Sequence, residues 1–199
     1  ELFAEFFQAF AGINSDADDH AFVDSAAFPD VIHHYRSKYD SRLQAHPESE
    51  LIEQFLQFKA RRLPEIGLRA ATGIEELIEL PVAKAIVSGS YTREIKAGVE
   101  AAGLSTDAFA LVLGSDEYSP WKPDPAGVLL AASRLARAPG HTAVLEDSIS
   151  GLTAARNAGM QPVFIAEFSA AAWNEASELT TWSFATVRDF VRFVRQAER

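Results

Sequence analysis

Two adjacent acids stand at the end of an apolar segment in the sequence TAVLEDSISGLTAARNAGM, residues 142–160. Glu146 and Asp147 follow residues typical of a buried strand, and a helical pattern begins directly behind them. An ionised carboxylate at the end of a buried strand is costly unless it is solvated, paired, hydrogen-bonded or bound to a metal. Carboxylate oxygens are ligands that magnesium prefers, so the pair is a candidate site for a divalent cation.

Other polar residues also follow apolar segments that predict strands. Ser88 and Gly89 come after AKAIV, and Asp116 and Lys122 come after ALVLG. Ligands of open parallel sheets bind outside the carboxyl ends of the strands. A hydroxyl and the N–H groups of a Ser-Gly turn can donate to phosphate oxygens, and a lysine supplies positive charge. Together with the two acids, this set predicts a site for a phosphate ester held with a divalent cation.

The elements that would position these residues alternate between strand and helix from about residue 80 onward. Predicted strands cover residues 83–87, 110–114, 142–146, 162–168 and 182–187. Strands that alternate with helices of this length favour parallel pairing through right-handed crossovers. We therefore predict an α/β fold with a three-layer, Rossmann-like parallel sheet core over residues 71–199.

The first part of the chain has a different pattern. Residues 12–70 contain helical stretches such as ESELIEQFLQFKARRL and no convincing strand. Residues 1–11 are amphipathic, with Phe6 and Phe7 among their apolar residues. We predict a first core helix at 1–11, followed by an inserted α-helical cap domain at 12–70.

Composition limits the classes of partner. The chain has 199 residues, 48% of them hydrophobic, and a net charge of −10. This charge and the lack of basic runs disfavour nucleic acid and anionic membranes as partners. No apolar stretch reaches the ~18 residues of a membrane span, and there is no cysteine for disulfides or thiolate sites. We expect a cytoplasmic protein, a monomer or weak dimer, with a small-molecule partner.

With these motifs in this order, the sequence resembles the haloacid dehalogenase-like superfamily. The similarity is to its branch with a helical cap, which includes phosphoglycolate phosphatase and beta-phosphoglucomutase. AIVSGS carries the second family motif at Ser88, WKPDP the third at Lys122, and VLEDSISGLTAARNAGM the fourth at Glu146 and Asp147. The resemblance covers residues 71–199 well and the insert only by position and helical character. Trp121 stands where many relatives have glycine, so we expect it to reshape the pocket wall.

The resemblance implies a Mg²⁺-dependent phosphatase-type hydrolase of a small phosphorylated metabolite, acting through an aspartyl-phosphate. Asp147 would be a metal ligand, and Glu146 would orient the metal shell. Ser88 would bind the phosphate together with the backbone of Gly89. Lys122 would stabilise charge on the phosphate and the nucleophile, so Ser88 and Lys122 are the implied catalytic residues. Two alternatives stay open: a sugar phosphomutase on the same scaffold, and a catalytically inactive homologue that binds a phosphoester or a partner.

The family's nucleophilic aspartate has no clear counterpart in residues 1–199. In the family it ends an apolar strand as Asp-x-Asp-Gly, before the helix that leads into the cap, and residues 1–10 already have the pattern of that helix. The segment DADDHAFVDS, residues 16–25, has no apolar strand before it and would place Ala17 at the nucleophile. We therefore expect the strand with the nucleophile to lie outside this sequence, and the enzyme activity depends on it.

Overall fold

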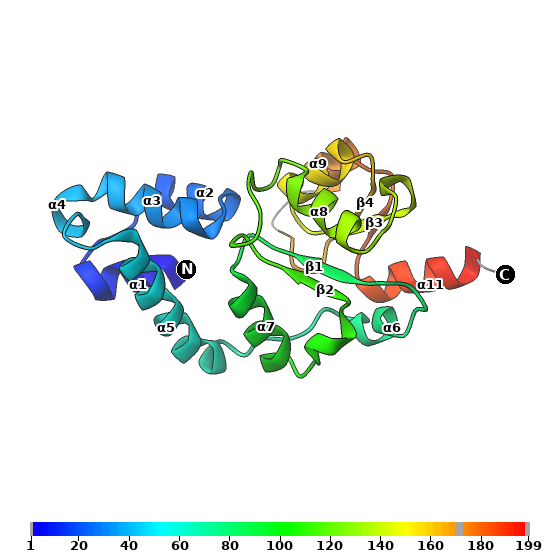
Figure 1. Ribbon diagram of the computed structural model, residues 1–199, viewed down its shortest axis with the longest axis horizontal. Helices are drawn as coiled ribbons and strands as arrows, with labels where there is room; N and C mark the ends of the chain where they lie inside the picture. Colours follow the sequence, from blue (N-terminus) through cyan, green and yellow to red (C-terminus); the bar gives the residue numbers. More distant parts are fainter. Residues whose placement is uncertain (1, 170–172, 198–199) are drawn as a thin grey trace.

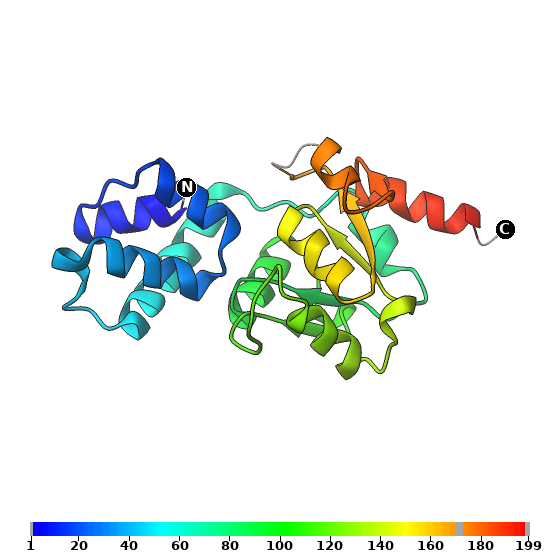
Figure 2. The same cartoon turned by 90° about the horizontal axis from the view of Figure 1, so that it is seen from above.

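The computed structural model describes residues 2–169 and 173–197 as two lobes (Figure 1). One lobe contains only helices. The other contains all the described strands with further helices around them. A single strand-free segment, residues 67–73, crosses between the lobes (Figure 2). None of the described helices is both long and apolar enough to span a membrane.

The helical lobe is held together by one aromatic-rich core. Its helices are α1 (Leu2–Ala11), α2 (Ala17–Ser25), α3 (Phe28–Lys38), α4 (Asp40–Leu43) and α5 (Glu48–Ile66). Phe7 of α1 stacks on Tyr35 of α3 at 4.0 Å between ring centroids, and both are fully buried. Phe6 packs edge-on against Phe55 of α5. These ring contacts explain why α1 joins the helical lobe, whereas the sequence pattern predicts a core helix at residues 1–11. The cap boundaries at residues 12 and 70 remain predictions.

A buried carboxylate links α2 to α3 in this lobe. Asp19 is fully buried and accepts hydrogen bonds from Lys38 Nζ at 2.8 Å and from Tyr39 Oη at 2.6 Å. His34 Nε2 also lies 2.8 Å from an oxygen of Asp19. Burial raises the pKa of Asp19, but the hydrogen bonds from Lys38, Tyr39 and the backbone of Asp16 outweigh it and hold this pKa well below its usual range. The carboxylate is therefore charged and paired inside the lobe.

The strands pair in parallel, as the sequence predicts. They are β1 (Ala85–Val87), β2 (Leu111–Leu113), β3 (Ala143–Glu146), β4 (Gln161–Ile165) and β5 (Ser183–Phe184). β1 pairs with β2, and separately β3, β4 and β5 pair in that order. Val87 of β1 and Val144 of β3 pack into one hydrophobic cluster with Val128 and Ala132, so the two sheets lie side by side. Among the described strands, each end strand has one edge without a ladder partner; these are β1, β2, β3 and β5.

Helices cover both faces of the strands. They are α6 (Ile74–Ile78), α7 (Thr92–Ala101), α8 (Ala126–Arg134), α9 (Ile149–Asn157), α10 (Trp173–Ser177) and α11 (Val187–Ala197). Successive side chains of a strand point to opposite faces. In β4, Val163 and Ile165 pack with α6 and α11, whereas Phe164 between them packs with α9 and α10. This alternation produces the predicted three layers, with the strands in the middle.

The segment that crosses between the lobes is tied to the end of β4. Glu167 accepts hydrogen bonds from Thr72 N at 2.8 Å, Thr72 Oγ1 at 2.7 Å and Arg69 Nη1 at 2.8 Å. Burial raises the pKa of Glu167, but the bonds from Thr72 and Arg69 lower this pKa by more, to a net value below its ordinary 4.5. The charged form of Glu167 therefore anchors the crossing segment.

Candidate functional site

Ser88, the first residue of the candidate site, directly follows the last residue of β1. Its backbone N–H donates to the Leu113 carbonyl at 3.0 Å, and its Oγ accepts from the N–H of Ser90 at 3.1 Å. In the part of the chain that the structure describes, the N–H of Gly89 donates to no protein acceptor. The turn is thus fixed on β2 while it keeps a hydroxyl and a backbone N–H as donors for a phosphate oxygen.

Lys122 connects the end of β1 to the end of β3. Its Nζ donates to the carbonyl oxygen of Val87 at 3.1 Å and forms an ion pair with Glu146. The side chain of Lys122 is 18% exposed and that of Glu146 is 11% exposed. Three of the residues predicted from sequence, Ser88, Lys122 and Glu146, therefore converge on one edge of the strands.

Glu146 is held by the first turn of α9. Ser148 caps this helix by accepting the N–H of Gly151 at 3.1 Å, and its hydroxyl donates to Glu146 Oε2 at 3.3 Å. A Cβ atom on Gly151 would lie 2.1 Å from Glu146 Oε2. The short sequence from Glu146 to Gly151 therefore supplies both a partner for the carboxylate and the space that it occupies.

Asp147 lies next to this pair and is exposed. Its backbone carbonyl accepts a hydrogen bond from the hydroxyl of Ser169. Among the described residues, its carboxylate makes no hydrogen bond or ion pair. It is therefore available to a ligand from solvent.

The donor set at this edge fits magnesium. Glu146 and Asp147 supply hard carboxylate oxygens. The described ranges contain no group of three or more His, Asp or Glu side chains that could hold a metal by themselves. Magnesium keeps several waters and binds through one or two protein carboxylates plus substrate phosphate. Asp147, whose carboxylate is exposed, fits such a ligand, and Glu146 beside it is already held by Lys122 and Ser148.

Tyr118 also supports the site, although it belongs to none of the sequence motifs. Its hydroxyl donates to the Ser88 carbonyl at 3.2 Å. Burial, with a smaller contribution from the charge of Glu146, raises the pKa of Tyr118 to about 12, which keeps it a neutral donor. A Cβ on Gly127 would lie 2.5 Å from the Tyr118 ring, so α8 needs glycine there. The tyrosine in SDEYSP carries no sequence signal for this role because the contact depends on how α8 packs.

Two other residues of the loop after β2 have structural roles. Asp116 Oδ1 accepts from the N–H of Thr92 at 2.7 Å and from its hydroxyl at 3.0 Å, and so joins the loop to the start of α7. Trp121 packs in a core cluster with Leu113, and its Nε1 donates to the Ser115 carbonyl at 3.1 Å. Trp121 therefore braces the loop that carries Lys122.

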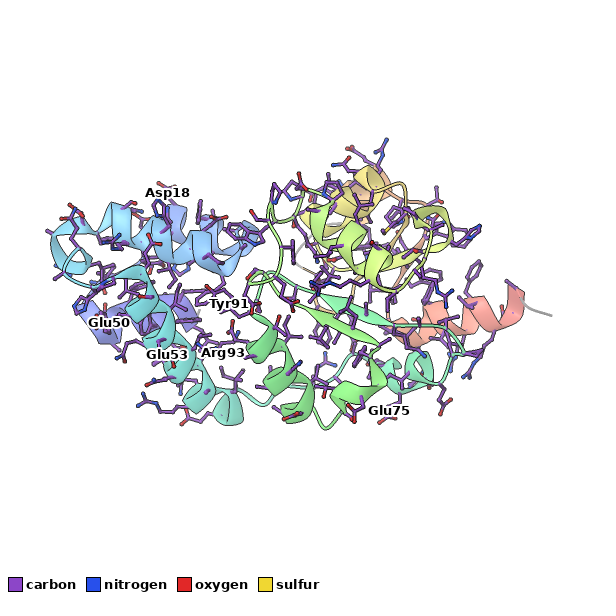
Figure 3. All side chains as sticks on the ribbon, viewed as in Figure 1. Asp18, Glu50, Glu53, Glu75, Tyr91 and Arg93 are labelled. Atoms are coloured by element: carbon purple, nitrogen blue, oxygen red, sulfur yellow. The ribbon has the colours of Figure 1, made fainter. Side chains whose placement is uncertain are left out.

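The helical lobe covers the Ser88 turn. The N–H of Phe28, at the start of α3, donates to the Gly89 carbonyl at 3.2 Å. A cavity of about 260 Å³ lies between this turn and the helices; its lining residues are Phe3, Val23, Ala26, Phe28, Phe55, Lys59, Ser88, Gly89, Ser90 and Glu94. Figure 3 shows Glu53 of α5 beside Arg93 of α7 at the junction of the two lobes, where they form an ion pair of 2.7 Å. The Ser88 turn is thus the floor of a cavity whose walls come from the helices.

A sequence model of one protein family matches most of the chain. Residues 4–159 match the model described as "Hydrolase: haloacid dehalogenase-like hydrolase". The chain belongs to the haloacid dehalogenase-like hydrolases. This confirms the resemblance drawn from the motifs at Ser88, Lys122 and Glu146–Asp147.

Individual relatives agree with this family. The chain is 29% identical to Protein CbbY from Rhodobacter capsulatus over 154 residues, which are 69% of this chain and 68% of that protein. It is 39% identical over 59 residues to a bifunctional riboflavin kinase/FMN phosphatase from Arabidopsis thaliana, a match that spans 30% of this chain and only 16% of that protein. CbbY from Rhodobacter sphaeroides, solved in complex with phosphate, superposes with a TM-score of 0.78 at 18% identity, covering 94% of this chain and 86% of that one. The fold is therefore the scaffold of this family's phosphatases and phosphomutases.

Proposed function

We propose that the protein is a Mg²⁺-dependent phosphatase-type hydrolase of a small phosphorylated metabolite, acting through an aspartyl-phosphate. The observation that carries the proposal is Lys122, whose ammonium contacts the residue before Ser88 and the residue before Asp147. The hydroxyl of Ser88, the ammonium of Lys122 and the carboxylates of Glu146 and Asp147 therefore lie at one edge of the strands. The complex of phosphate with a CbbY protein of the same fold supports a phosphoester as the ligand class.

Each residue has a defined task in this proposal. Ser88 and the N–H of Gly89 bind non-bridging phosphate oxygens, and Lys122 neutralises charge that collects on the phosphate and the attacking carboxylate. Glu146 holds the Lys122 ammonium in place and would orient the metal shell, and Asp147 would be the ligand of magnesium. When bound, the metal would act as a Lewis acid on the phosphate.

The nucleophilic aspartate belongs, in this proposal, to a strand that pairs with β1 and β3. Each of these strands has an edge with no partner among residues 2–169 and 173–197, and hydrophobic side chains of both meet in one cluster. Lys122 spans the carboxyl ends of the same two strands. An aspartate at the end of a strand between them would therefore face the lysine and the Ser88 turn.

The helical lobe would act as the cap of this enzyme. It touches the Ser88 turn through Phe28 and is connected to the strands by the segment that Glu167 anchors. We propose that it moves as a unit about residues 67–73, admitting substrate and then excluding water.

The test is to incubate the purified protein with small phosphoesters and Mg²⁺ and to follow both phosphate release and covalent labelling. The proposal predicts release of inorganic phosphate and an acid-stable, hydroxylamine-sensitive phosphoenzyme, which peptide mapping would assign to an aspartate. An isomerised sugar phosphate without net phosphate release would instead establish the phosphomutase alternative. Phosphate binding with neither product nor phosphoenzyme would establish the non-catalytic alternative.

A further inference from the structure

The cavity above the Ser88 turn has one apolar wall and one charged end. The wall is formed by phenylalanines from three helices: Phe3 stacks on Phe55 at 4.1 Å, and Phe28 lies 5.2 Å from Phe55. Phe55 is 2% exposed and Phe28 is 6% exposed, so the rings are fixed by packing. Such a wall suits the carbon skeleton of a ligand, since it offers apolar contact and no hydrogen-bonding group.

The charged end is an ion pair between the two lobes. Lys59 of α5 donates to Glu94 Oε1 of α7 at 2.7 Å, and their side chains are 23% and 9% exposed. Glu94 Oε2 accepts the N–H of Tyr91 at 3.0 Å, which fixes the carboxylate. An ammonium has three N–H donors, and among the described residues only one of those on Lys59 is used. The cavity therefore presents free donors directly beside a carboxylate.

This pairing determines which group the end of the cavity can accept. A hydroxyl can accept from Lys59 and donate to Glu94 at the same time. A carboxylate or a second phosphate could also accept a hydrogen bond from Lys59. Such an anion would, however, be repelled by the negative charge of Glu94, whose side chain is only 9% exposed. The volume of about 260 Å³ lies below the ~300–1,000 Å³ of pockets for drug-sized ligands, which favours a small metabolite.

We propose that this cavity binds the alcohol part of the phosphoester, and that Lys59 and Glu94 select an uncharged, hydroxylated group over an anionic one. The inference rests on the proposed function, because Ser88 and Gly89 at the floor must hold the phosphate. It narrows the substrate class to the monophosphate of a small polyol or sugar.

The experiment measures the Kd of four ligands by calorimetry without Mg²⁺, so that the esters are not hydrolysed during the titration. Inorganic phosphate, which has no ester bond, is also titrated with Mg²⁺. The ligands are inorganic phosphate, n-butyl phosphate, erythritol 4-phosphate and 4-phosphoerythronate, of which the last three share a four-carbon chain. We expect erythritol 4-phosphate to bind at least about ten-fold more tightly than n-butyl phosphate, the effect of one hydrogen bond to a charged group. We expect erythritol 4-phosphate to bind more tightly than 4-phosphoerythronate by a similar factor.

Two variants assign this preference to the ion pair. Lys59→Met is expected to raise the Kd of erythritol 4-phosphate about ten-fold. It should change the Kd values of inorganic phosphate and n-butyl phosphate by less than about three-fold. Glu94→Gln removes the negative charge, so 4-phosphoerythronate is expected to bind as tightly as erythritol 4-phosphate or more tightly. The matched control is Arg93→Met, which removes the ion pair with Glu53 between the same two helices outside the cavity lining, and which should leave all four Kd values unchanged.

The outcomes separate this inference from the function on which it rests. If no ligand binds, including inorganic phosphate, the phosphate site itself is wrong and both proposals fall. If inorganic phosphate binds but the three esters are equal, or if Lys59→Met and Arg93→Met behave alike, the selective role of Lys59 and Glu94 is refuted and the phosphate site stands.

Discussion

The ion pair between Lys122 and Glu146 should stabilise the fold measurably, because both partners are largely buried. Removing one partner of a fully buried pair costs about 3–5 kcal/mol, since it leaves an uncompensated charge. Here the remaining exposure of 18% and 11% lets water reach the stranded group. We therefore expect Lys122→Met to lower the free energy of unfolding by about 2–3 kcal/mol.

A double-mutant cycle isolates the pair from other effects of each substitution. Glu146→Gln and the double variant complete the cycle, and urea unfolding followed by circular dichroism gives the four free energies. Groups in direct contact couple by about 0.5–3 kcal/mol, and we expect about 2 kcal/mol here. The exposed pair Arg195–Glu79, with side chains 48% and 69% exposed, serves as the control and should show no coupling beyond measurement error. A coupling equal to that of the control would refute the idea that Lys122 joins the two strand ends through Glu146.

Three further substitutions probe the supporting contacts. Gly151→Ala should push the Glu146 carboxylate aside and weaken Mg²⁺-dependent phosphate binding without unfolding the protein; unchanged affinity would show that the close approach has no role. Asp19→Asn should lower the free energy of unfolding by about 1.5–3 kcal/mol, because the buried carboxylate loses its charge-assisted hydrogen bonds from Lys38 and Tyr39; a loss below about 0.5 kcal/mol, the range of ordinary surface changes, would contradict the network. The folded-state pKa of Glu167 is depressed, so its stabilising effect is present above about pH 4.5 and is lost as the pH falls through the folded pKa. The difference in free energy of unfolding between the wild type and Glu167→Gln should therefore become smaller as the pH drops below 4.5. A difference independent of pH would count against the role of Glu167 as an anchor.

Sequence patterns predicted the sheet-containing lobe well. Each apolar run that was expected to be a strand contains one, and Ser88, Lys122 and Glu146 meet because parallel strands place their carboxyl ends at one edge. The fourth motif could be interpreted in detail because its residues act locally, within one strand end and one helix turn. Its glycine and its serine both serve the carboxylate of Glu146.

Contacts between distant segments could not be predicted in the same way. The apolar residues of α1 predict an amphipathic helix, but they do not indicate which lobe packs against its apolar face. The roles of Tyr118 and Glu94 likewise depend on how α8 and α5 pack, and a lone tyrosine or glutamate carries no signal for that. The cavity at Lys59 is therefore a feature of the tertiary structure.

Coupling between magnesium and phosphate at Asp147 is what the proposed site requires. The measurement is calorimetric titration of inorganic phosphate with and without Mg²⁺, for the wild type and for Asp147→Asn. We predict that Mg²⁺ tightens phosphate binding by about ten-fold or more in the wild type, and that Asp147→Asn loses that gain because a charged ligand is gone. Phosphate affinity that is the same with and without Mg²⁺, or a gain that persists in Asp147→Asn, would contradict the assignment of this edge as a magnesium-assisted phosphate site.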